Sequence, residues 1–420
     1  MNERMQPIMD LIEDTLDAEI SLQELADRAG YSLWHFCRMF QADVGMPLMR
    51  YRLRRRLAHA LYAIHQGSGV TDAALRYGFD THAGFYKAFL KEYGCSPTEY
   101  LKTHRALKPW RLQLKEERYL MLTLENWKKA LTAWELENLP LQPVVYEPSG
   151  MLSDHAVFAG DDWVLKAYLD PALCNRMIAL AHTLEDAGLP AAIPLPLPGG
   201  PESFTYGAYE ITLCRRIRGD RPVPSALLAT PADNGRRIGQ TLRQLHAALD
   251  ASDNLPELND VRLDEHILHW ALPLAAPHLP AAFPADFTQR VQKLAGLPRG
   301  VIHRDPNPGN LILMPDGRIG LIDFDLTQYS TRLFDLCYAA TGVLLEVIDQ
   351  ADVPWRTAWP VFLQGILDGY GASEAERAAA PTVVLGIEVI CIAAFANSEK
   401  FKPLLDVNMR ILNWLLTLPA

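Results

Sequence analysis

Two copies of one short pattern lie near the start of the chain, and each reads as a helix, a glycine turn and a second helix. In the first copy Ser21 can cap the first helix, Gly30 permits the tight turn, and Ser32 can cap the second helix. The second copy begins at Val70 and places its second cap at Asp80. Such a pair can lay its second helix in the major groove of DNA. The pattern therefore predicts an all-α domain with two helix-turn-helix units that binds double-stranded DNA.

One long helix is predicted between the two units, from Pro47 to Gln66. A helix of about 20 residues spans ~30 Å, which is close to the ~34 Å of one turn of B-DNA. Both recognition helices can then enter successive major grooves. Arginines crowd the first half of this helix. We expect Arg50 and Arg54 to face DNA phosphates and the remaining arginines of residues 50–56 to form surface ion pairs.

Residues 8–105 resemble the DNA-binding domain of AraC-type transcriptional regulators. The matching residues are Leu25, Ala26, Gly30, Ser32, Phe36, Arg38, Phe40, Gly45, Pro47, Tyr51, Arg54, Ala60, Ala74, Gly78, Phe79, Phe85, Lys87, Phe89, Gly94, Ser96 and Pro97. The resemblance implies base readout by Leu33, Trp34, His35 and Arg38 in the first recognition helix, by Thr81, His82 and Tyr86 in the second, and a phosphate contact by Lys87. Packing of Trp34 against its neighbours is the alternative. Ala83 and Gly84 stand where the family usually has polar residues, which suggests that the second unit reads DNA shape more than sequence.

A second motif lies in the C-terminal half of the chain. Asp305 is followed five residues later by Asn310, and Asp323 ends an apolar strand after the Pro315–Gly317 turn. This is the spacing of kinase-type phosphoryl transfer. Asp305 would accept the proton of the attacking hydroxyl, while Asn310 and Asp323 offer the hard oxygen ligands that Mg²⁺ prefers. His303, just before them, is expected to be a buried structural imidazole.

Region 144–415 resembles the aminoglycoside phosphotransferase and choline kinase-like group. Upstream of the motif, Lys166 stands in the strand Trp163–Tyr168. The resemblance implies that Lys166, with Ser149, Gly150 and Ser153 of the preceding loop, holds ATP, and that Mg²⁺ accompanies it. It further marks His246 as a helix end and Asp335 as a structural aspartate. The helix after the lysine strand has Asn175, Arg176 and Met177 where the group places a glutamate for that lysine, and Glu185 comes about two turns late.

Composition and charge divide the chain into two parts. Hydrophobic residues make up 49% and the formal net charge is −10. Residues 1–130 hold 19 Lys and Arg against 16 Asp and Glu, whereas the rest holds 21 against 34. The six scattered cysteines form no Cys-x-x-Cys pair, which indicates reduced thiols and no metal site built from them. No apolar run is long enough to span a membrane and no secretory leader is visible, so we expect a cytoplasmic protein without membrane association.

The predicted fold class is multidomain, an all-α double helix-turn-helix domain followed by an α+β kinase-like bilobal domain. We expect the first at 1–105, a connector at 106–142, an N-terminal lobe at about 143–217 and a C-terminal lobe at about 218–420. The acidic balance of the second domain mildly favours a cationic ligand. Trp355, Trp359 and Tyr370 could line its pocket, although core packing is the alternative.

Three functions fit this combination. In the first, the chain is an AraC-family regulator whose kinase-like domain binds a nucleotide, a small-molecule effector or both. In the second, the kinase-like domain is an active ATP-dependent phosphotransferase of a small alcohol or amino-sugar that also carries a DNA-binding module. In the third, the DNA-binding module has lost its function. The resemblance also suggests a transcriptional activator, with RNA polymerase as a candidate partner.

Overall fold

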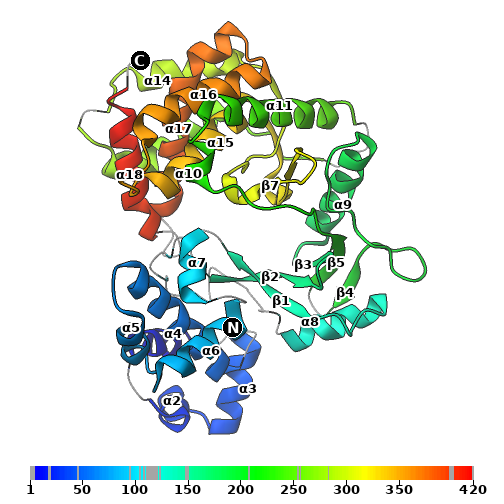
Figure 1. Cartoon of the computed structure of the whole chain (residues 1–420), viewed down its shortest axis with the longest axis vertical. Helices are drawn as coiled ribbons and strands as arrows, with labels where there is room; N and C mark the ends of the chain where they lie inside the picture. Colours follow the sequence, from blue (N-terminus) through cyan, green and yellow to red (C-terminus); the bar gives the residue numbers. More distant parts are fainter. Residues whose placement is uncertain are drawn as a thin grey trace. The chain divides into compact units, whose positions relative to one another are not determined.

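A computed structural model describes residues 5–418 of the chain, except 18–19, 45–46, 94–95, 104–105, 107–108, 110–121, 123, 147–150, 207–208, 253–254, 256, 282 and 397–401. The chain divides into two compact units (Figure 1). The first consists of Met1–Leu169 with Leu195–Cys214, and the second of Asp170–Pro194 with Arg215–Ala420. Each unit is described by itself.

The first unit begins with seven helices, which contain both predicted helix-turn-helix pairs. They are α1 (Met5–Asp14), α2 (Leu22–Ala29), α3 (Leu33–Val44), α4 (Leu48–His65), α5 (Val70–Arg76), α6 (His82–Tyr93) and α7 (Pro97–Thr103). The Ser21 hydroxyl accepts the Glu24 N–H at 3.1 Å, and Gly30 ends α2 with a φ of 74°, as predicted. The cap expected at Asp80 is wrong, because the Thr81 hydroxyl accepts the Gly84 N–H at 3.0 Å instead.

Each helix-turn-helix pair has its own apolar core, and α4 belongs to both. Phe36 and Phe40 are fully buried in the first core, where Tyr51 of α4 joins them. Phe85 and Phe89 are fully buried in the second, against Leu57 and its neighbours on α4. The linker helix therefore sets the spacing of the two recognition helices, because each half of it is built into one core.

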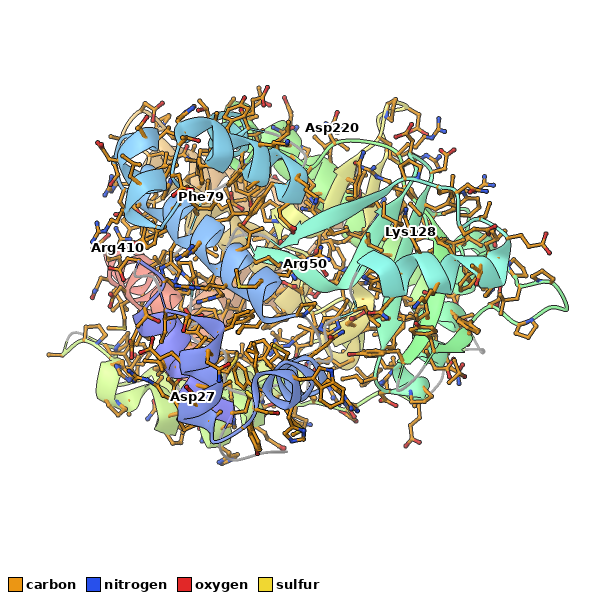
Figure 2. The ribbon with its side chains drawn as sticks, turned by 90° about the horizontal axis from the view of Figure 1, so that it is seen from below. Asp27, Arg50, Phe79, Lys128, Asp220 and Arg410 are labelled. Carbon is orange, nitrogen blue, oxygen red and sulfur yellow. The ribbon has the colours of Figure 1, made fainter. Side chains whose placement is uncertain are left out.

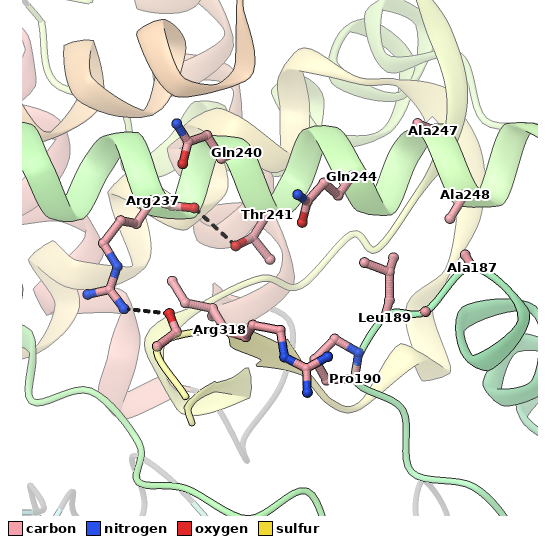
Figure 3. Close-up of a pocket in the computed structure, with 13 residues that line it drawn as sticks. Ala187, Leu189, Pro190, Arg237, Gln240, Thr241, Gln244, Ala247, Ala248 and Arg318 are labelled. Atoms are coloured by element: carbon pink, nitrogen blue, oxygen red, sulfur yellow. Dashed lines mark hydrogen bonds between the residues drawn. The ribbon is translucent and has the colours of Figure 1, made fainter. Parts of the chain in front are cut away.

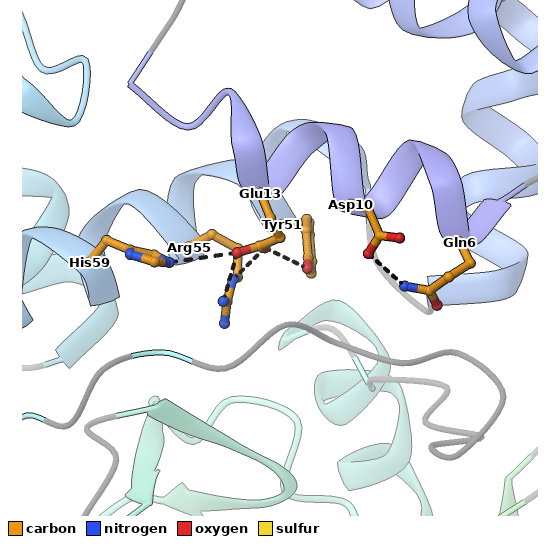
Figure 4. Close-up of polar contacts among 6 residues, drawn as sticks. All are labelled: Gln6, Asp10, Glu13, Tyr51, Arg55 and His59. Carbon is orange, nitrogen blue, oxygen red and sulfur yellow. Dashed lines mark hydrogen bonds and ion pairs between the residues drawn. The ribbon is translucent and has the colours of Figure 1, made fainter. Parts of the chain in front are cut away.

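Arg52 and Arg55 of α4 are buried, so the prediction that they form surface ion pairs was wrong. Arg55 is 3% exposed and donates from Nε and Nη2 to Glu13 of α1 at 2.6 and 2.8 Å (Figure 4). Arg52 is also buried and donates to the Ile20 carbonyl at 3.0 Å. Arg56 donates to the Leu16 carbonyl at 2.8 Å. These side chains tie the linker helix to the chain segment around α1.

A five-stranded sheet follows in the same unit and forms the N-terminal lobe. Its strands are β1 (Leu141–Tyr146), β2 (Met151–Ala159), β3 (Trp163–Tyr168), β4 (Phe204–Tyr206) and β5 (Tyr209–Arg215), in the order β1-β2-β3-β5-β4. Before the sheet come α8 (Leu124–Leu131) and the turn η1 (Thr132–Trp134). Trp127 and Trp134 are buried in the same core as Leu165 of β3. The second half of segment 106–142 thus packs with this lobe.

The second unit is mainly helical and forms the C-terminal lobe. Its helices are α9 (Pro171–Asp186), α10 (Pro224–Leu227), α11 (Pro231–Asp250), α12 (Leu263–Glu265), the π-helix η2 (His266–Ala271), α13 (Leu272–Ala275), η3 (Ala276–His278), α14 (Phe287–Gln292), η4 (Lys293–Gly296), η5 (Pro308–Asn310), η6 (Phe324–Leu326), α15 (Leu333–Val347), α16 (Trp355–Tyr370), α17 (Glu374–Ala396) and α18 (Lys402–Leu415). Strand β6 (Arg299–Ile302) pairs with β9 (Gln328–Thr331), and β7 (Leu311–Leu313) pairs with β8 (Ile319–Leu321).

Helix α11 carries residues of the site and is held against α16 at very short range. A Cβ on Gly239 would collide with the Ile366 carbonyl oxygen, and one on Gly369 would collide with the Arg236 carbonyl oxygen. Only glycine permits backbones to approach this closely. Among the described helices, α17 alone has the length and apolar composition to cross a membrane, but 67% of its most apolar window is buried within this lobe. We therefore describe α17 as the core helix of the C-terminal lobe.

Candidate functional sites

The first recognition helix, α3, exposes all four side chains expected to read DNA. Trp34 is 67% exposed, and its role in base readout stays a prediction. The Arg38 guanidinium lies 4.5 Å from the centroid of the Trp34 ring, which orients it along the outer face of the helix. Leu33 and His35 are exposed beside them.

The second recognition helix, α6, likewise exposes Thr81, His82, Tyr86 and Lys87. The rings of His82 and Tyr86 lie 5.9 Å apart, one helical turn from each other. The Thr81 hydroxyl accepts the Gly84 N–H, so it caps the helix as well as standing at its tip.

The two linker-helix arginines expected to contact DNA phosphates are less exposed to solvent than the side chains of the recognition helices. Arg50 (labelled in Figure 2) is partly buried, and its Nη2 lies 3.7 Å from Glu92 Oε1 on α6. Arg54 is partly buried near Tyr93. Their contact with DNA stays a prediction.

A buried carboxylate organises the loop that carries the second motif. Asp335, at the start of α15, is 0% exposed and accepts the backbone N–H groups of His303 and Arg304 at 2.8 and 2.9 Å. It also binds Nε2 of His246 at 3.0 Å. Burial raises the pKa of Asp335, but the hydrogen bonds and charges of its histidine neighbours outweigh burial and leave it lowered. Arg304 is held at a φ of 75°, a left-handed backbone typical of active-site strain.

His303 joins the two halves of the motif. The imidazole is fully buried, as expected, and burial lowers its pKa, so it is neutral. Its Nδ1 accepts the Asp305 N–H at 3.2 Å, and its Nε2 lies 3.0 Å from the Ile322 carbonyl oxygen. Because an amide N–H only donates and a carbonyl only accepts, the proton sits on Nε2. His303 thereby links the loop of Asp305 to the residue before Asp323.

The Asp305 carboxylate is oriented by three donors. Asn307 Nδ2 donates to Oδ1 at 2.7 Å and Asn310 Nδ2 donates to Oδ2 at 3.0 Å, and the Tyr338 hydroxyl is a third partner. Burial and the nearby charge of Asp323 raise the pKa of Asp305 to about 6, against the lowering effect of the hydrogen bonds. A carboxylate with a pKa near the working pH is suited to act as a general base. Asn307, to which the sequence pattern assigned no role, is one of its supports.

The two predicted metal ligands stand at the base of one hairpin. Asn310 directly precedes β7, and Asp323 comes two residues after β8, whose Leu321 pairs with Leu311. The Ile322 N–H donates to the Asn310 carbonyl at 3.0 Å. Because Nδ2 of Asn310 is engaged by Asp305, its Oδ1 remains for a cation. Asp323 has a φ of 67°, a second strained non-glycine residue.

This donor set fits Mg²⁺, which binds through one or two protein oxygens together with nucleotide phosphates. Within the described residues, no group of three or more His, Cys, Asp and Glu side chains forms a self-contained metal site. The five described cysteines, Cys37, Cys174, Cys214, Cys337 and Cys391, are free thiols, as predicted.

The predicted nucleotide-holding residues belong to the N-terminal lobe. Lys166 lies within β3, opposite Ala156 of β2, and is partly buried. The Ser153 hydroxyl accepts the Ala156 N–H at 3.1 Å. Ser149 and Gly150 lie outside the described residues. Glu185, in the last turn of α9, is exposed and stands 3.6 Å from His182.

A buried acid near Asp305 was not found from the sequence. Glu388 of α17 is 2% exposed, and its Oε2 has no hydrogen-bond partner among the described residues. Burial raises its pKa to about 8, so the carboxyl is largely protonated at neutral pH. Burial raises the pKa of Cys391, one turn further on, and the charges of Glu388, Arg304 and Asp305 also act on this pKa. The sequence feature that could have indicated this buried acid is a carboxylate, Glu388, within an apolar stretch of α17.

The aromatic residues considered for a ligand pocket are structural. Trp355 and Trp359 are buried and pack edge-on against Trp414, and Trp359 Nε1 donates to the Ala340 carbonyl at 2.8 Å. The Tyr370 hydroxyl lies 2.9 Å from His246 Nδ1 and completes the chain that ends at Asp335. The core-packing alternative is therefore the correct one for both tryptophans.

The geometry defines a class of protein, a double helix-turn-helix domain joined to a kinase-like phosphotransferase fold. Two family models match the chain, a helix-turn-helix domain at residues 25–103 and the phosphotransferase enzyme family at residues 147–381. The HTH-type transcriptional activator AarP of Providencia stuartii is 40% identical over 90 residues, which are 21% of this chain and 67% of AarP. The multiple antibiotic resistance protein MarA of Escherichia coli (strain K12) is 31% identical over 98 residues, which are 23% of this chain and 77% of MarA.

Solved structures resemble the other part of the chain. The amicoumacin kinase hAmiN, in complex with AMP-PNP, Ca²⁺ and Ami, superposes with a TM-score of 0.51 at 16% identity and covers 68% of this chain and 91% of its own. This likeness shows the fold. The chain belongs to the phosphotransferase enzyme family and carries an AraC-type helix-turn-helix domain at its N-terminus. The predicted fold class is confirmed.

Proposed function

We propose that this protein is a DNA-binding transcriptional regulator whose kinase-like domain binds a magnesium nucleotide together with a small-molecule effector. The observation that supports the proposal is the coexistence on one chain of exposed recognition helices and an ordered kinase-type motif. The recognition helices expose their reading side chains around Trp34 and Arg38. In the C-terminal lobe, Asp335 holds the backbone just before Asp305, and Asn310 Nδ2 donates to the Asp305 carboxylate.

The chemistry of the second site supports nucleotide binding. Asn310 and Asp323 would hold Mg²⁺, which offsets the charge of nucleotide phosphates when it is bound. Lys166 would pair with those phosphates. The structurally similar kinase hAmiN was solved with AMP-PNP and Ca²⁺, a nucleotide analogue and a divalent cation.

AarP is named a transcriptional activator. We extend activation to this chain, with RNA polymerase as the protein partner. The DNA-binding role and the free thiols support a cytoplasmic location.

Turnover is the second candidate function, and the state of Asp305 favours it. With its pKa raised to about 6, the Asp305 carboxylate can accept the proton of a substrate hydroxyl near neutral pH. Asn307 and Tyr338 orient it for that task.

One experiment tests nucleotide binding and turnover together. Binding of Mg-ATP to the full chain is measured by calorimetry, and ADP release is followed across a panel of small alcohols and amino-sugars. We expect Asp323→Asn to weaken Mg-ATP binding at least ten-fold, whereas Asp352→Asn, which changes an exposed carboxylate of the same lobe, leaves it unchanged. Any turnover should fall about 10²–10⁴-fold in Asp305→Asn. Absence of Mg-ATP binding at millimolar concentration would refute the nucleotide proposal.

DNA binding is tested at Arg38. We expect Arg38→Ala to weaken binding by about 1–3 kcal/mol, or about 5- to 150-fold, because the change removes a cation that can bond a guanine edge. The DNA probe is a genomic fragment enriched by the wild-type protein, and binding is read by fluorescence anisotropy. Arg28→Ala is the control, since Arg28 of α2 is exposed and pairs with Glu24 of its own helix. Equal affinity in both variants would contradict the assignment of α3.

A further inference from the structure

A hollow on the C-terminal lobe lies apart from every residue assigned so far (Figure 3). Its volume is about 720 Å³, within the usual range for small-molecule sites. Three segments enclose it, namely one face of α11, the chain just after α9, and the turn between β7 and β8. The lining residues are Ala187, Gly188, Leu189, Pro190, Arg237, Gln240, Thr241, Gln244, Ala247, Ala248, Gly317, Arg318 and Ile319.

The charge of this hollow is opposite to that of the domain around it. After residue 130 the chain holds 34 acidic against 21 basic residues, yet the lining contains two arginines and no carboxylate. Arg237 donates from Nη2 to the Gly317 carbonyl at 3.0 Å, and no ion pair joins it to a carboxylate in the described part of the chain. Arg318 uses Nε for Asp316, at 2.8 Å, which leaves its Nη groups for another acceptor.

Neutral polar groups complete the wall between the arginines and the opposite end. Gln240, Thr241 and Gln244 of α11 line the hollow, and Gln240 and Gln244 are exposed (Figure 3). Their amides and hydroxyl can both donate and accept hydrogen bonds, as a polyhydroxylated ligand requires. The far end is lined by Ala187, Gly188 and Ala247, which leave room for the body of a ligand.

We propose that this hollow is a binding site for a phosphate ester of a small polyhydroxylated molecule. The phosphate binds the Nη groups of Arg318, because arginine matches phosphate oxygens with paired N–H donors. Arg237, on the other side of the β7–β8 turn (Figure 3), donates to the ligand at that end. The hydroxyl groups bind Gln240 and Gln244. The site is distinct from the nucleotide site, since none of Asp305, Asn310 and Asp323 lines it.

The walls of this site connect it physically to the predicted metal ligands. The β7–β8 hairpin lines the hollow at its turn and carries Asn310 and Asp323 at its base. Helix α11 lines the hollow with Arg237 and, further along, supplies His246 to Asp335. A ligand that binds Arg237 and Arg318 therefore acts on both elements that position the motif. The effect of this ligand on nucleotide binding is the one part of the proposal that rests on the proposed function.

The test uses the full chain and three probes, glucose 6-phosphate, inorganic phosphate and glucose, by calorimetry in magnesium-free buffer. We expect glucose 6-phosphate to bind most tightly, phosphate more weakly and glucose hardly at all. Arg237→Gln should weaken glucose 6-phosphate at least ten-fold. Arg236→Gln is the matched control, because its neighbouring guanidinium pairs with Asp233 at 2.6 Å and does not line the hollow. Arg318→Gln provides a second variant if Arg237→Gln proves unstable.

The coupling is read separately from the affinity of Mg-ATP with and without saturating glucose 6-phosphate. We expect a change of three-fold or more in the wild type and none in Arg237→Gln. Loss of glucose 6-phosphate binding in Arg237→Gln without any Mg-ATP binding would uphold the site and refute only the proposed nucleotide function. Equal binding of glucose 6-phosphate by wild type and both arginine variants, or no binding at all, would overturn the proposal.

Discussion

Asp335→Ala is expected to destabilise the C-terminal lobe by at least about 3 kcal/mol. Three donors lose their acceptor at once, the N–H groups of His303 and Arg304 and Nε2 of His246. Each buried donor left without a partner costs about 1–3 kcal/mol. Because these donors also hold Arg304 in its left-handed conformation, the loop of Asp305 should lose its shape with them.

Denaturant unfolding of the full chain, followed by hydrogen exchange in the C-terminal lobe, measures this loss. Asp349→Ala is the control, because Asp349 is a partly exposed ion-pair partner of Arg410 and exposed pairs contribute about 0–1 kcal/mol. The pKa of Asp335 is lowered in the folded protein. Its contribution is therefore present above the ordinary carboxyl pKa and is lost as the pH falls below it. Equal stability of the two variants would disprove the role assigned to Asp335.

Glu13→Gln is expected to destabilise the DNA-binding domain by about 3–5 kcal/mol, because the change leaves the Arg55 guanidinium buried without a counter-charge. Glu13 is the common acceptor of Arg55 and of the Tyr51 hydroxyl at 2.9 Å, and His59 lies 3.6 Å away (Figure 4). Burial raises the pKa of Glu13, but Arg55 and His59 together lower it to about 2. Hydrogen exchange of the α1 and α4 amides reports the effect.

The same pair makes the domain sensitive to acid. The folded pKa of Glu13, about 2, lies below its ordinary value of 4.5. The stabilisation, on the order of 3 kcal/mol from this difference, is therefore complete above pH 4.5 and disappears as the pH falls toward 2. In Glu13→Gln this part of the acid sensitivity should be absent. Glu24→Gln is the control, since Glu24 pairs with Arg28 in solvent. A wild-type acid profile in Glu13→Gln would contradict the assignment.

The sequence identified what depends on nearby residues. Asp305, Asn310 and Asp323 were found because their spacing and residue types reflect one loop and one hairpin. The glycine turn at Gly30 and the cap at Ser21 were found because both act within a few residues. The cap of α6 was misplaced by one residue, at Asp80 in place of Thr81, because either side chain can serve and only the helix start decides.

The sequence could not show which side chains are buried by contacts between segments of the fold. The arginine-rich sequence of α4 predicts an exposed basic surface. Arg52 and Arg55 are instead buried, because α1 and the segment after it cover that side of α4. Glu388 reads as an interruption of a core helix, and only the fold brings it near the loop of Asp305. The hollow proposed to bind an anion likewise brings together Arg237 and Arg318, which lie far apart along the chain.

By itself the sequence identified a domain with two helix-turn-helix units and a kinase-type motif that follows it. It did so because helix caps, glycine turns and the phosphoryl-transfer motif each depend on residues that are close together in the sequence. The tertiary structure alone decided that Arg52 and Arg55 of the linker helix are buried and tie that helix to the segment around α1. Burial removes a charge from water, and only a counter-charge brought by the fold, here Glu13 for Arg55, can keep it there.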